Sequence, residues 1–197
     1  NRGDLERSRR ELTIALALAR LDVETDPSQP RRHALLARIG FDWLRTSENQ
    51  DEARSMLSEG RKALAAIPEK ALSSSEFLAL RARACLAELA VDATAAPVAC
   101  ETQILPDLMG SALDDPDMIE LAGELAVALK TRRQGSISVT QINSIKNRLQ
   151  ELPKQLRVSL RHLLVLRLLG GQTYSDSDEL KEIDQQINHL RASFKHN

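Results

Sequence analysis

The stretch HALLARIGFDWLRTSENQDEARSMLSEGRKALAAIP, residues 33–68, decides how we interpret the fold of the whole chain. In its first half, apolar residues recur at steps of three and four, which places them on one side of a helix. A break follows at 46–49, where Asn49 is suited to cap a second helix, with Glu52 completing a capping box. Pro68 ends the unit, because the residue before a proline is pushed away from helical angles. The stretch therefore predicts a helix, a turn and a second helix.

The order of large and small residues in this stretch resembles the tetratricopeptide repeat. The similarity rests on Leu36-x2-Ile39-Gly40-x2-Trp43, then Ala53-x3-Leu57-x2-Gly60, and then Pro68. The two glycines leave room for two helices to approach closely, and the tryptophan is expected to be a buried packing residue. The resemblance implies a helical-repeat scaffold that binds a protein or peptide through exposed positions of the first helix of each repeat.

The same kind of pattern predicts helices along the rest of the chain. A leading helix is expected at 4–24, followed by helical hairpins at 31–68, 73–111, 115–152 and 154–194. Caps and prolines place the first helices about 40 residues apart, the regularity that stacked two-helix repeats require. We therefore predict one all-α domain over 1–197, in which about nine helices form antiparallel hairpins stacked as a short α-solenoid. An irregular helical bundle is the alternative.

Composition favours helix and limits the classes of partner. Aromatic residues make up only 3% of the chain, too few to supply stacking platforms for single-stranded nucleic acid. The formal net charge of −1 gives no general attraction to nucleic acid or to anionic membranes. No uncharged apolar run reaches the roughly 18 residues that a membrane-spanning helix needs. We expect a cytoplasmic location and a protein or peptide as partner, with a second copy of the chain as a further option.

Candidate chemistry is sparse in this sequence. Cys85 and Cys100 can form at most one disulfide, and their apolar helical surroundings favour buried reduced thiols. The four histidines lack the spacing of zinc ligands, and no HExxH, GxSxG or P-loop sequence is present. We therefore expect no catalytic residues, no metal and no cofactor. A helical enzyme without recognisable motifs is the alternative class.

Charged residues supply the candidate binding positions. Acidic residues without Lys or Arg fill 101–124, whereas Lys154, Arg157, Arg161 and Arg167 form a basic set. Solvated helix faces explain this segregation, and the alternative is a docking surface on which Arg157 and Arg161, one turn apart, contact a partner's carboxylates. The candidate partner-binding residues, from the repeat resemblance and this basic set together, are Arg45, Arg81, Glu88, Glu120, Arg157 and Arg161.

The sequence thus predicts a non-catalytic scaffold or adaptor that binds a protein or peptide on a helical-repeat surface. The alternative is a regulatory, sensor or effector domain of a larger bacterial protein, such as a transcription regulator or a kinase. The start at Asn1 rather than Met motivates that alternative, because it indicates a fragment or a processed form. The richness in alanine and arginine is typical of a bacterial source with a high genomic GC content.

Overall fold

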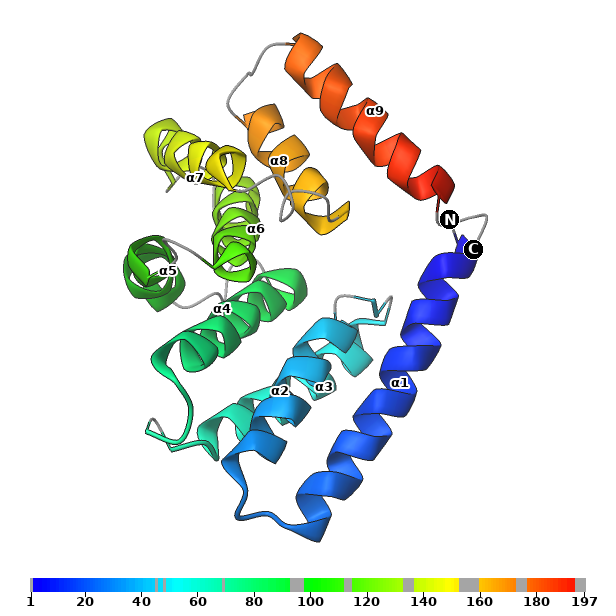
Figure 1. The fold of residues 1–197 in the computed structure, drawn as a ribbon. Coiled ribbons are helices and arrows are strands. Elements are labelled where there is room, and N and C mark those ends of the chain that lie inside the picture. The colour runs from blue at the N-terminus through cyan, green and yellow to red at the C-terminus, as the bar shows by residue number, and fades with distance from the viewer. Residues whose placement is uncertain are drawn as a thin grey trace. The chain divides into compact units, whose positions relative to one another are not determined.

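A computed structural model shows a helical protein (Figure 1). The structure describes residues 2–44, 46–47, 49–68, 70–92, 98–111, 115–132, 137–152, 160–172 and 177–193. These ranges contain nine α-helices, one short π-helix and no strand. The prediction of an all-α fold is confirmed, whereas the stacking of the hairpins into a solenoid stays a prediction.

The chain divides into two compact units, Asn1–Cys100 and Glu101–Asn197. The first unit contains α1 (Arg2–Thr25), α2 (Pro30–Leu44), α3 (Gln50–Ala65) and α4 (Ser74–Val91). The π-helix η1 (Cys100–Ile104) begins at Cys100, which is the last residue of the first unit. The second unit contains α5 (Leu105–Ser111), α6 (Pro116–Arg132), α7 (Val139–Glu151), α8 (Leu160–Gln172) and α9 (Ser177–Ser193). Each predicted hairpin spans two of these α-helices, and a single repeat domain over the whole chain stays a prediction.

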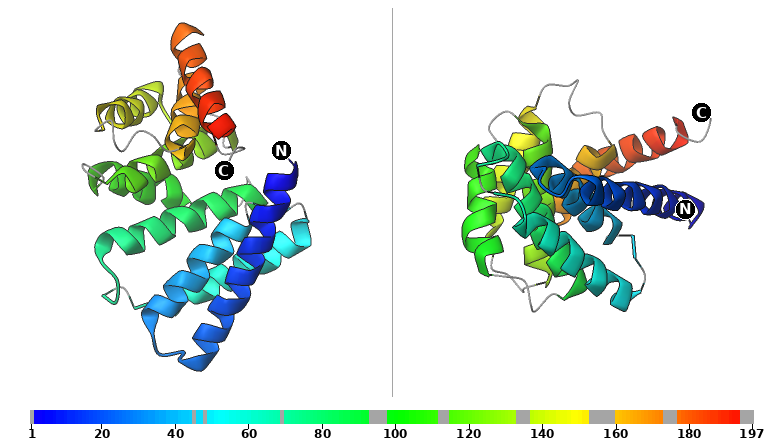
Figure 2. Two further views of the ribbon diagram at one scale, coloured as in Figure 1. Left: turned by 45° about the vertical axis from the view of Figure 1, so that its right-hand side comes forward. Right: turned by 90° about the horizontal axis from the view of Figure 1, so that it is seen from below.

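In the first unit α2 is the central helix, because it packs against α1, α3 and α4 (Figures 1 and 2). Of the expected apolar stripe, Leu36, Trp43 and Leu44 are buried, whereas Leu35 is 46% exposed. Phe41, only 1% exposed, adds to this buried side. Trp43 is also buried, as predicted, and donates its indole N–H to Thr13 Oγ1 of α1 at 3.1 Å. The guanidinium carbon of Arg9 lies 5.6 Å from the centre of the Trp43 ring, a cation–π arrangement. The tryptophan thus fixes α1 against α2.

The cap that the sequence predicts for α3 is present in all but one detail. Asn49 Oδ1 accepts hydrogen bonds from the backbone N–H groups of Asp51 and Glu52, at 2.9 and 3.4 Å. The Glu52 carboxylate, expected to reach back to Asn49, accepts instead from Arg9 Nη2 at 2.9 Å. Helix α4 begins with a capping box formed by Ser73 and Glu76, and hydrogen bonds from the hydroxyl and backbone N–H of Ser73 lower the pKa of Glu76. Local chemistry therefore decides where these helices begin.

Helices α2 and α3 approach closely at Gly40 and Gly60, as expected. A Cβ atom added at Gly40 would lie 3.9 Å from the Gly60 Cα and 3.8 Å from Met56 Sδ, which is ordinary van der Waals contact. A Cβ atom added at Gly60 would lie 2.6 Å from Cε1 of the buried Phe41 ring. Because that ring is enclosed by the core, it has little room to move. Of these two positions, only 60 must therefore be a glycine for α2 and α3 to pack as they do.

This difference predicts opposite effects for two matched substitutions in one hairpin. Gly60→Ala should lower the free energy of unfolding by roughly 1–3 kcal/mol, because it overpacks the core against Phe41. Gly40→Ala should leave stability unchanged or raise it by up to about 1 kcal/mol, because alanine is the better helix former. Urea unfolding followed by circular dichroism measures both changes. Equal effects of the two substitutions would contradict the packing described here.

In the second unit α6 is the central helix and packs against α5, α7 and α8. A Cβ atom added at Gly123 would lie 2.5 Å from Val165 Cγ1, so this glycine permits the close packing of α6 on α8. In the leucine-rich helix α8, Leu163, Leu166 and Leu169 are buried, whereas Leu168 is 49% exposed. Arg167 Nε donates to Asp184 Oδ1 at 2.8 Å and so joins α8 to α9. Among the helices of the described residues, none has the length and apolar character needed to cross a membrane.

Candidate functional site

The predicted partner-binding arginines are described only in part. Arg45 and Arg157 lie outside the described residues. Arg161 lies in α8, where the structure describes its backbone only. Arg81 lies in α4 and is half-buried. The suggested docking pair of Arg157 and Arg161 therefore stays a prediction.

The two predicted acidic positions, Glu88 and Glu120, were expected to be exposed, and this expectation is wrong. Their exposed fractions are 7% and 4%. Glu88 faces α3 and pairs with Arg61, and Glu120 lies on α6, whose contacts with three other helices leave little of its circumference free. Packing against other helices buries these carboxylates. The spacing of residues within a single helix does not reveal such burial.

A different surface, on α3, gathers cations around an apolar floor. A shallow, open groove of about 450 Å³ runs along the exposed side of this helix. Its described lining consists of Arg54, Leu57, Ser58, Arg61, Lys62 and Ala65. These positions follow one another at alternating steps of three and one residues, so they share one side of the helix. No acidic residue is among this described lining, so the groove is basic.

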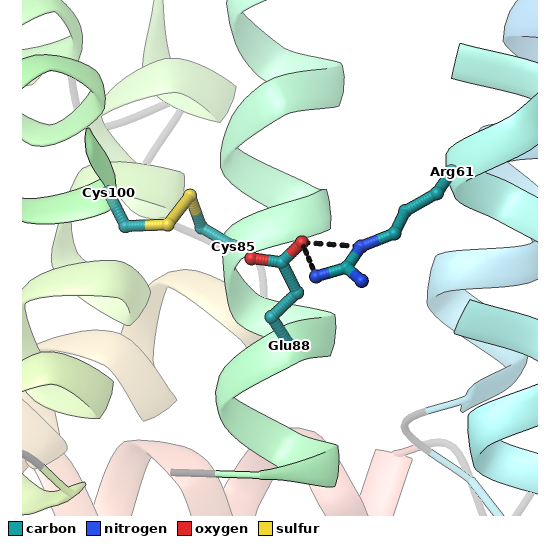
Figure 3. The surroundings of a disulfide bond; sticks show 4 residues. All are labelled: Arg61, Cys85, Glu88 and Cys100. Atoms are coloured by element: carbon teal, nitrogen blue, oxygen red, sulfur yellow. Dashed lines mark hydrogen bonds and ion pairs between the residues drawn. A yellow bond between two sulfur atoms is a disulfide. The ribbon is translucent and has the colours of Figure 1, made fainter. Parts of the chain in front are cut away.

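The three cations of the α3 groove differ in how firmly they are held. Arg54 Nη1 lies 3.7 Å from Oδ1 of the exposed Asp51, a weak surface pair. Lys62 makes no ion pair with any residue that the structure describes. The Arg61 Nε–H donates to Glu88 Oε1 at 2.7 Å, and Arg61 Nη2 lies 2.5 Å from the same oxygen (Figure 3). The Glu88 carboxylate therefore orients the Arg61 guanidinium, while 52% of the Arg61 side chain stays exposed to solvent.

Helix α4, which supplies Glu88, is held on its other side by a disulfide. Figure 3 shows Arg61 and Cys100 on opposite sides of α4, with Cys85 one turn before Glu88. The prediction of reduced thiols is wrong, because Cys85 and Cys100 are disulfide-bonded. The chain returns after α4 so that their Cα atoms lie 5.8 Å apart, within the range for a disulfide. Both cysteines are buried, with 5% and 1% exposed.

A further pair joins the groove helix to α1. Arg20 Nε and Nη2 donate to the two carboxylate oxygens of Glu59, at 2.6 and 2.5 Å. The side-chain hydrogen bonds with Glu59 raise the pKa of Arg20 above its ordinary value. Such a two-point contact between an arginine and a carboxylate fixes geometry as well as charge. Contacts to α1, α2 and α4 thus hold α3 in place.

The groove residues were not among the predicted binding positions, although a local signal for them exists. Arg61 and Lys62 follow Arg54 by seven and eight residues, so all three lie on the polar side of a helix that was correctly predicted. The missing information was the pairing of Arg61 with Glu88, since their sequence positions are 27 residues apart.

Comparison with known proteins found no relative. No protein-family model, no curated protein and no solved structure matches this chain. The resemblance of residues 36–68 to the tetratricopeptide repeat stays a prediction. Among the described residues, no group of three or more His, Cys, Asp or Glu side chains is placed to hold a metal ion.

The disulfide predicts a measurable contribution to stability. Closing a loop of about 15 residues restricts the unfolded chain, so removing the bond with the double variant C85S/C100S should cost about 3 kcal/mol. Denaturant unfolding of the oxidised protein, the reduced protein and the variant measures this cost. In denaturant, a thiol reagent should find no free thiol before reduction and two after it. Two reactive thiols before reduction would contradict the bond.

Proposed function

We propose that this chain is a non-catalytic protein-binding module that takes an acidic segment of a partner protein along α3. The observation that carries the proposal is the groove, in which Arg54, Arg61 and Lys62 surround an apolar floor at Leu57. From Arg54 to Ala65 the helix rises about 17 Å, at 1.5 Å per residue. At about 3.3 Å per residue, an extended segment of about five residues matches this length.

Two properties of the groove favour a partner with carboxylates. Arg61 is already oriented by Glu88, so it loses less conformational freedom when it donates to a second anion. Leu57 and Ala65 offer apolar contact between the cations, which suits a segment that mixes acidic and small apolar side chains. Exposed ion pairs contribute only about 0.2–1 kcal/mol each, so we expect micromolar or weaker affinity that falls as salt rises.

The binding proposal is tested with a fluorescein-labelled hexaglutamate peptide and fluorescence anisotropy. The double variant R54E/K62E should weaken binding at least tenfold, because it replaces two attractive charges with repulsive ones. The matched control, R38E/K70E, changes the net charge equally at exposed residues outside the groove and should change binding less than threefold. Circular dichroism confirms that both variants are folded. Equal losses in the two variants, or no loss in either, would overturn the proposed groove.

We also propose an oxidising compartment as the place of action, instead of the cytoplasmic location expected from the sequence. The support is the Cys85–Cys100 disulfide, because such bonds persist mainly in oxidising surroundings. Alkylation of intact cells before lysis, followed by mass spectrometry, tests this. Unalkylated, disulfide-bonded cysteines are expected, and alkylation of both cysteines would contradict the proposal.

A further inference from the structure

The exposed side of α1 carries a row of large apolar side chains. Ile14, Leu18 and Leu21 are 57%, 61% and 59% exposed. They follow one another at steps of four and three residues and so form one stripe, which we call the α1 stripe. The other side of α1, with Leu16 and Ala19, is buried in the core of the first unit. A contiguous apolar row of this kind marks an interaction surface.

Charges beside the α1 stripe indicate which partner fits it. Arg10, Ala17 and Glu24 are exposed and lie seven residues apart, about two helical turns, so they line up along one edge of the stripe. Arg10 and Glu24 are therefore equally far from Ala17, on opposite sides of it along the helix. Neither has an ion-pair partner within the part of the chain that the structure describes.

This spacing is complementary to an antiparallel copy of the same helix. When two α1 helices pair about a twofold axis at Ala17, Arg10 of each copy faces Glu24 of the other. In the same arrangement Ile14 of each copy lies beside Leu21 of the other, so apolar groups meet apolar groups. Parallel pairing would put Arg10 level with the other copy's Arg10 and Glu24 level with its Glu24, so it would not bring Arg10 beside Glu24.

We propose that two copies of the chain associate through antiparallel α1 helices. The contact is isologous, since both copies use the same patch, and it closes at two subunits. It goes beyond the proposed function, because the α3 groove takes no part in it. Arg20, which joins α1 to α3 through Glu59, lies away from the stripe and keeps its intramolecular partner.

The mass of residues 1–197 in solution is the first test. Sedimentation at protein concentrations from micromolar to a few hundred micromolar should show a mass that rises from 21.9 kDa toward twice that value. Leu18→Glu should keep the mass at 21.9 kDa over the same range, because it places a charge in the centre of the stripe. A single-chain mass for the unmodified protein at every concentration would overturn the proposal, as would a doubled mass that Leu18→Glu leaves unchanged.

A charge exchange tests the pairing of Arg10 with Glu24. The single variants R10E and E24R should each weaken association at least fivefold, whereas the double variant R10E/E24R should restore it. Restoration is expected because exchanging both charges recreates the two ion pairs with reversed sign. A double variant as weak as the singles would overturn the proposed antiparallel contact.

Engineered cysteines then test the orientation. Both native cysteines are disulfide-bonded, so an introduced cysteine is the only free thiol. Under mild oxidation Ala17→Cys should give a covalent dimer, because it lies near the twofold axis. Thr25→Cys, at the end of the stripe, should not, because in the antiparallel pair the two copies of this position lie more than about 20 Å apart along the helix axis. Equal cross-linking at both positions would overturn the antiparallel arrangement.

Discussion

A buried carboxylate needs a cation, and in the first unit this requirement joins α3 to α4. Glu88 would be an uncompensated charge without Arg61, a state that costs several kcal/mol. The pair therefore fixes the register between the two helices and the direction of the Arg61 guanidinium. The Cys85–Cys100 disulfide holds α4 on its opposite side, and an ion pair from Arg83 to Asp42 at 2.7 Å joins α4 to α2. The groove on α3 depends on this support.

Two surfaces of the first unit can then act together. The α3 groove presents cations, and the α1 stripe presents apolar side chains with complementary charges at its edge. Association through α1 would give one assembly two grooves. A partner with two acidic segments of suitable spacing would then bind more tightly than one groove allows, because the second contact forms at a high effective concentration. Weak single contacts are compatible with useful overall affinity in such an assembly.

The positions of the helices could be predicted well because caps, prolines and apolar spacing are local properties. Asn49 caps the helix that it was expected to cap, and the burial of Trp43 followed from its place in the apolar stripe. Predictions were wrong where the outcome depends on residues far apart in the chain. The burial of Glu88 and the disulfide between positions 85 and 100 both arise from tertiary packing. No pattern within a single helix contains that information.

The central claim is that α3 of this chain receives an acidic segment. The most direct measurement is a two-dimensional NMR titration of the isotope-labelled protein with unlabelled hexaglutamate peptide. The account predicts that the largest amide shift changes fall within 54–65 and at Glu88, whose carboxylate orients Arg61. Changes confined to α1 or to residues of the second unit, with α3 unaffected, would contradict it.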